Sequence, residues 1–154
     1  MRLQFAVFLV AVCVPATAAA QVTFDGCSDF RGIAVASIMN TNLPDVAAAN
    51  WAPNGAPIIM YNPYVLARLS PQTRLFFYAH ECAHHALGHA IRSIPFHQEQ
   101  EADCWGIRTL VARGALNGSQ DVMAVQNDLS FSPGDWTHVP GPRRAINLRA
   151  CLGR

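Results

Sequence analysis

The stretch His80-Glu81-Cys82-Ala83-His84 organises the expected fold of this 154-residue chain. Residues four apart lie on the same face of a helix, so His80 and His84 can offer ring nitrogens to one metal ion. Glu81 lies about 100° further round the helix. At that edge of the face it could accept a proton from a metal-bound water. The pattern therefore predicts a helix that carries two metal ligands and a general base.

The residues around this stretch favour a helix. Ser70-Pro71 is typical of an N-cap followed by proline in the first turn, and apolar positions then recur as far as residue 91. Phe76 shares the face of the two histidines, which predicts that the metal-binding face is also buried. His85 and His89 point away from that face, and we expect them to be partly exposed or hydrogen-bonded in the core rather than ligands of the same ion.

A third ligand is needed, and the acidic cluster at residues 99–103 supplies two candidates. A second helix is expected from there to about residue 112. On its helical wheel Glu99 and Asp103 form one stripe, while Glu101 falls on a solvated face. Glu99 is thus the better ligand, and Asp103 can orient a ligand histidine through its other ring nitrogen. The alternative is that these acids only complement the N-terminal end of the helix dipole.

These two motifs together resemble the gluzincin metallopeptidases. The resemblance is greatest to the family that holds the CAAX prenyl endopeptidase and the membrane-bound bacterial heat-shock protease. It implies zinc, one ion per chain, with roles that fall on the following residues: His80, His84 and Glu99 as ligands, Glu81 as general base and Asp103 as supporting carboxylate. This chain lacks the transmembrane helices of those relatives, so a membrane-embedded substrate is not carried over.

A weaker element of the same resemblance lies near the C-terminus. The family carries a His-Pro pair followed by an arginine, and His138 and Arg144 are similar to it, although Val139 interrupts the pair. His138, Arg144 or Tyr61 could stabilise a tetrahedral oxyanion, and we place the first two ahead of Tyr61. The alternative for Arg144 is a charge on a helix surface.

The N-terminal residues predict export. Arg2 precedes an apolar run over residues 5–14, and Ala18-Ala19-Ala20 offers a small-residue cleavage site. We expect a signal peptide at residues 1–20 and a mature domain at residues 21–154 that is periplasmic or secreted. A buried helix or a membrane anchor is the alternative.

Four cysteines remain after the signal peptide, which is an even number suited to an oxidising compartment. Sequence allows three pairings. We favour Cys82–Cys104, between helices that must pack together, and Cys27–Cys151, which would join the ends of the domain. Thiolate ligation of the metal is the less favoured alternative, because Cys82 lies on a different helical face from His84.

The expected fold class is α+β, a mostly helical single domain of zincin type with a small sheet. Residues 33–39 suggest a helix, Asn54-Gly55 a turn, and residues 119–129 and 142–152 two late helices. Residues 57–63, bounded by prolines, suggest an edge strand beside the metal helix. Such an edge could bind substrate backbone, or the sheet could merely close the core.

The expected function is hydrolysis of peptide bonds in a peptide or protein substrate, by zinc-activated water with Glu81 as base. Two alternatives stay open, a zinc-binding protein without catalysis and an amidase that acts on cell-wall peptides. A net charge of +1 gives no indication of nucleic-acid binding.

Overall fold

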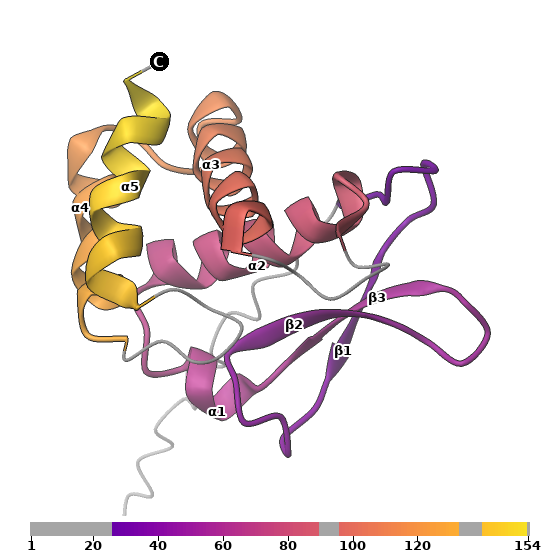
Figure 1. The fold of residues 1–154 in the computed structure, drawn as a ribbon. Helices are drawn as coiled ribbons and strands as arrows, with labels where there is room; N and C mark the ends of the chain where they lie inside the picture. The colour runs from indigo at the N-terminus through magenta and orange to yellow at the C-terminus, as the bar shows by residue number, and fades with distance from the viewer. Residues whose placement is uncertain (1–25, 90–95, 133–139, 154) are drawn as a thin grey trace, which may run out of the picture.

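The structure is a computed structural model that describes residues 26–89, 96–132 and 140–153. Within these residues the chain forms one mixed α+β domain with a three-stranded sheet and five helices (Figure 1). The fold class is therefore confirmed. The expected signal peptide and His138 lie outside the described residues.

The central strand of the sheet contains residues that were predicted to form an edge strand. The strands of the sheet are β1 (Ala36–Met39), β2 (Ala47–Trp51) and β3 (Pro57–Tyr61), in the order β1-β3-β2. β3 pairs in parallel with β1 and antiparallel with β2. Pro57 is the first residue of β3 and Pro63 lies beyond its end, so neither proline interrupts the ladder of hydrogen bonds. The prediction of an edge strand here was wrong, and β2 is the edge strand nearest the metal helix.

The prediction of a helix at residues 33–39 was also wrong, because this segment contains β1. All four residues of β1 are exposed, so burial of their side chains does not decide the conformation. Pairing with β3, from Ala36 opposite Ile58 to Met39 opposite Tyr61, decides the conformation instead.

Five helices follow the sheet in the described part of the chain, and the later ones lie at the predicted positions. Their bounds are α1 (Pro63–Leu66), α2 (Pro71–Ala86), α3 (Phe96–Ala112), α4 (Ser119–Ser130) and α5 (Gly141–Leu152). Ser70 caps α2 as expected, and its hydroxyl also donates to Asp128 of α4 at 2.6 Å. α2 ends earlier than predicted because Gly88 adopts a φ of 77°, a left-handed conformation that terminates helices.

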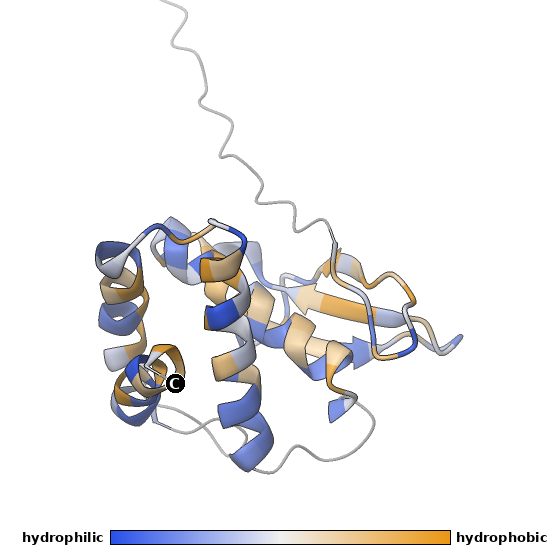
Figure 2. Cartoon of the chain, turned by 90° about the horizontal axis from the view of Figure 1, so that it is seen from above, coloured by the Kyte–Doolittle hydropathy of each residue, from blue (hydrophilic) through white to orange (hydrophobic). Residues whose placement is uncertain are grey.

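The helix α2 lies between the sheet and the helices α3, α4 and α5 (Figure 1). Figure 2 shows that the helices carry both apolar and polar residues along their length. The apolar side chains form two clusters on opposite sides of α2. The cluster on the helical side includes Phe76, Ile107, Leu110, Leu129 and Leu148. The cluster on the sheet side includes Cys27, Val35, Ile59, Tyr78 and Cys82. The helix α2, which carries His80 and His84, is thus packed on both sides.

Two disulfides are present, but the pairing differs from the prediction. Cys27 bonds to Cys82, and Cys104 bonds to Cys151. Cys82 and Cys104 lie on helices that pack together, yet Cys82 faces the sheet-side cluster and Cys104 packs against the other. The first bridge therefore ties the segment before β1 to α2, and the second ties α3 to α5.

None of the helices within the described residues combines the length and the apolar character that crossing a bilayer requires.

Candidate metal centre

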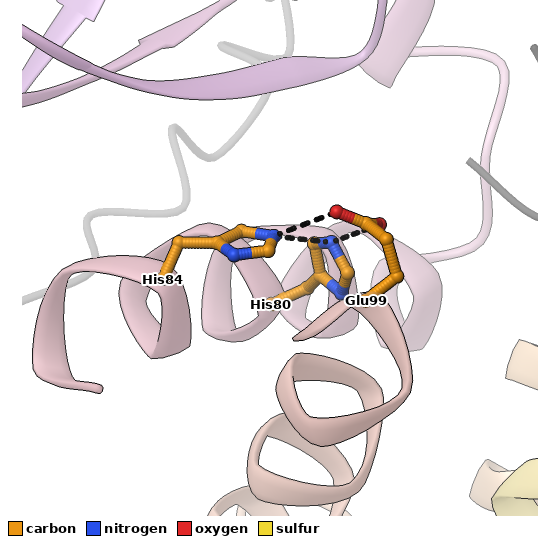
Figure 3. Close-up of side chains that lie close together, drawn as sticks. All are labelled: His80, His84 and Glu99. Atoms are coloured by element: carbon orange, nitrogen blue, oxygen red, sulfur yellow. Dashed lines mark hydrogen bonds and ion pairs between the residues drawn. The ribbon is translucent and has the colours of Figure 1, made fainter. Parts of the chain in front are cut away.

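Three buried side chains from two helices converge at one point (Figure 3). The Nε2 atoms of His80 and His84 on α2 are 3.0 Å apart. Glu99, in the first turn of α3, places Oε2 3.3 Å from His80 Nε2 and Oε1 3.3 Å from His84 Nε2. All three residues are almost inaccessible to solvent. This group could hold a metal ion, as the sequence predicted.

A carboxylate and an arginine support His80 from the side opposite Glu99. Asp103 Oδ1 lies 2.8 Å from His80 Nδ1, and Arg144 of α5 holds both oxygens of Asp103, at 2.5 and 2.9 Å. Burial alone would raise the pKa of Asp103, but Arg144 and His80 outweigh burial and lower this pKa to about 2. Arg144 is 3% exposed, so the alternative that it is a surface charge was wrong.

The same contacts change the acidity of His80 in the metal-free protein. Burial opposes its positive charge, but hydrogen bonds to Asp103 and Glu99 favour that charge more strongly. The pKa of His80 is therefore raised to about 9. A proton and a metal cation thus compete for the same electron-rich cluster.

The second histidine, His84, also has a partner, which the sequence did not indicate. His89 Nδ1 lies 3.3 Å from His84 Nδ1, and His89 Nε2 lies 3.2 Å from a carboxylate oxygen of Glu101. On a continuous helix His89 would point about 140° away from His84. Because α2 ends before Gly88, the chain turns back and brings the two rings together. The only sequence signal was Gly88 itself, which is a common helix terminator.

Glu81 lies on α2 beside His80 and is 4% exposed. Its Oε2 accepts a hydrogen bond from the backbone N–H of Ala49 in β2, at 2.7 Å. Val46 O accepts from Asn62 N, and Ala52 N donates to Ala56 O, so the backbone groups of both residues point toward the β3 side. In an antiparallel pair this direction alternates from residue to residue, so the N–H of Ala49 points away from β3. The edge strand β2 thus holds the carboxylate through its backbone, which no side-chain pattern in the sequence could reveal.

The remaining predicted residues take different positions. His85 is buried, and its Nε2 donates to the carbonyl of Ile58 at 2.8 Å, so it is a core histidine as expected. Burial also lowers the pKa of His85 and of His89. Glu101 lies on the solvated side of α3, with 60% of its side chain exposed. Tyr61 is the last residue of β3 and is half-buried, and an oxyanion role for Tyr61, Arg144 or His138 stays a prediction.

Comparison with known proteins adds no relative: no protein-family model, no curated protein and no solved structure matches this chain.

Proposed function

We propose that this protein is a zinc-dependent metallopeptidase of gluzincin type. The observation that carries the proposal is the convergence of His80, His84 and Glu99, with the buried carboxylate of Glu81 on the same helix. A site that only stabilises a fold needs no additional carboxylate beside its ligands, and it normally has four protein ligands. Three ligands and a base are the composition of catalytic zinc sites.

The distances support zinc as the ion. Zinc binds histidine nitrogen and carboxylate oxygen at about 2.0–2.2 Å, and tetrahedral geometry then separates neighbouring ligand atoms by about 3.3–3.5 Å. Here the two histidine Nε2 atoms are 3.0 Å apart, and each lies 3.3 Å from an oxygen of Glu99. These separations are close to the tetrahedral ones, so only small side-chain movements are needed to bind the ion. When bound, zinc supplies Lewis acidity that activates water and polarises an amide carbonyl.

Glu81 has the role of general base in this proposal. It accepts the proton of the attacking water and passes it to the leaving amine. The hydrogen bond from Ala49 occupies Oε2, which leaves Oε1 for the proton transfer. The edge strand β2 adjoins this carboxylate, so we assign to β2 the substrate-binding role that the sequence suggested for residues 57–63.

The proposed substrate is a peptide or protein. The hypothesis has two further parts, peptidase activity with zinc and export through the expected signal peptide. The two disulfides support the export part, because disulfides persist in oxidising compartments. The resemblance to the CAAX prenyl endopeptidase and heat-shock protease family supports the peptidase part. The non-catalytic zinc protein and the cell-wall amidase are outcomes that the experiment separates.

The experiment combines metal content with hydrolysis. Purified protein loaded with Zn²⁺ is incubated with a diverse peptide library and with cell-wall peptides, and products are identified by mass spectrometry. We expect peptide cleavage that falls about 10²–10⁴-fold in Glu81→Gln, the loss typical of removing a general base. Zinc content should stay at one per chain in this variant, because Glu81 is not a ligand.

Two variants of the acidic cluster test whether Glu99 is the third ligand, with Glu101→Gln as the matched control for Glu99→Gln. Glu99→Gln should lose most of its zinc affinity, whereas Glu101→Gln should bind zinc nearly as wild type, because residue 101 is exposed and glutamine keeps an acceptor for His89. Zinc binding without cleavage of any library member would support the non-catalytic alternative. Cleavage restricted to cell-wall peptides would support the amidase.

A further inference from the structure

The two histidine ligands differ in the groups that hold them. His80 is supported by Asp103 and Arg144, which are both buried. His84 is supported by His89, which is buried, and through His89 by Glu101, which is mostly exposed. We propose that His89 and Glu101 form a positioning pair that sets the tautomer and the orientation of His84 as a metal ligand. The proposal rests on the metal-binding part of the proposed function and is independent of catalysis.

Only one arrangement of hydrogens satisfies these contacts when a metal is bound. His84 Nε2 points toward His80 and Glu99, so its lone pair faces the metal and Nδ1 carries the hydrogen. His84 Nδ1–H can then donate to His89 Nδ1, which must be an acceptor. In neutral His89 the hydrogen therefore resides on Nε2 and is donated to Glu101. The carboxylate thus selects the tautomer of His89, and His89 selects that of His84.

The pair also connects two elements of the site. His89 follows the end of α2, and Glu101 is in α3, two residues after the ligand Glu99. A hydrogen bond between them therefore relates the His84 ring to the turn that carries Glu99. Because Glu101 is mostly exposed, its hydrogen bond to His89 contributes little to the stability of the fold, and we expect its effect in the metal site.

A second metal site on these residues does not fit the contacts. His84 and His89 approach each other through their Nδ1 atoms, whereas Glu101 lies at the opposite nitrogen of His89. The three donors do not converge on one point, in contrast to His80, His84 and Glu99. A relay of hydrogen bonds explains the same contacts with every group paired.

The test uses variants that separate the two ring nitrogens of His89. His89→Leu removes both contacts, while His89→Asn keeps an acceptor near the position of Nδ1 and loses the contact to Glu101. Supporting partners of metal-bound histidines typically change metal affinity about 10–100-fold. We expect His89→Leu to weaken Zn²⁺ binding by that factor in competition with a chelator, and His89→Asn and Glu101→Ala to weaken it less. Glu101→Gln, which keeps an acceptor for His89, should bind Zn²⁺ with nearly wild-type affinity.

Two readouts distinguish positioning from a general loss of structure. Nitrogen-15 spectra of the zinc-loaded protein should show His84 with its hydrogen on Nδ1 in wild type, and loss of that ordered hydrogen in His89→Leu. The visible absorption of Co²⁺-loaded protein should change in His89→Leu and stay unchanged in His97→Leu, which replaces an exposed histidine on α3. Thermal unfolding of the metal-free variants should be nearly equal.

Failure of this inference is distinguishable from failure of the proposed function. If wild type binds neither Zn²⁺ nor Co²⁺, the metal site itself is wrong, and this inference is overturned together with the proposed function. If wild type binds both ions and His89→Leu matches His97→Leu in affinity and spectrum, only the role of His89 and Glu101 is overturned.

Discussion

Gly106 on α3 lies so close to the backbone of His80 on α2 that a Cβ atom at this position would be 3.2 Å from the His80 nitrogen and 3.3 Å from the Ala79 carbonyl carbon. The neighbouring atoms are backbone, which cannot move aside as a flexible side chain does. The absence of a side chain at Gly106 therefore sets how closely the helix of the two histidines approaches the helix of Glu99.

Gly106→Ala should push α2 and α3 apart and weaken metal binding. Overpacking of this kind costs about 1–3 kcal/mol, partly offset by the gain of about 1 kcal/mol in helix propensity. Chelator competition and urea unfolding measure the two effects. Gly153→Ala is the control, because the nearest atom to its Cβ is 3.7 Å away. Unchanged metal affinity in Gly106→Ala would contradict the assigned spacing role.

The buried pair of Asp103 and Arg144 should be strongly coupled. Removing one partner from a buried ion pair typically costs about 3–5 kcal/mol because the other charge stays buried. Asp103→Leu and Arg144→Met should each destabilise the metal-free protein by this amount, while the double variant should cost clearly less than the sum. A double-mutant cycle by urea unfolding measures the coupling. Arg143→Met, which changes the adjacent exposed arginine, should be nearly neutral. Additive single effects would contradict the coupling.

The raised pKa of His80 predicts a pH dependence of metal binding. In the metal-free protein this pKa is about 9, above the usual histidine value of 6.5, so the protonated form stabilises the fold. That stabilisation is complete below pH 6.5 and is lost as the pH rises through 9. Metal must displace this proton, so affinity should rise about tenfold per pH unit up to about pH 9. Proton release measured on adding Zn²⁺ at pH 7 should approach one per site, and a flat pH profile would contradict the prediction.

The hydrogen bond from Ala49 to Glu81 can be removed by changing the backbone. Ala49→Pro deletes the N–H, and proline is tolerated on an edge strand where the N–H points away from the sheet. If the protein is a peptidase, hydrolysis should fall about 10–100-fold through misplacement of the base, with metal content unchanged. Ala49→Gly, which keeps the N–H, is the matched control. Equal activity in the two variants would show that Glu81 does not depend on β2.

Peptide mapping without reduction should find Cys27–Cys82 and Cys104–Cys151. These bridges close loops of 55 and 47 residues, so the chain-entropy model predicts nearly equal stabilisation by each. Replacing either pair with alanine should cost about 2–5 kcal/mol in urea unfolding. A Cys82–Cys104 peptide in the oxidised protein would contradict the observed pairing.

The sequence by itself determined the parts of the site that depend on helical periodicity. A repeat of 3.6 residues places His80 and His84 on one face, and the same repeat separates Glu99 and Asp103 from Glu101. The start of α2 at Pro71 was likewise predictable, because the cap of Ser70 is a local interaction. Each of these inferences needs only residues a few positions apart.

The tertiary structure alone decided what depends on distant partners. Strand β1 forms because β3 is available to pair with it, and the cysteine pairing follows from the faces that α2 and α3 turn toward the two clusters. The contact between His89 and His84 requires the turn at Gly88, and Glu81 is held by a backbone N–H that carries no signal in the sequence. Periodicity shows which face a residue occupies, whereas packing decides what lies against that face.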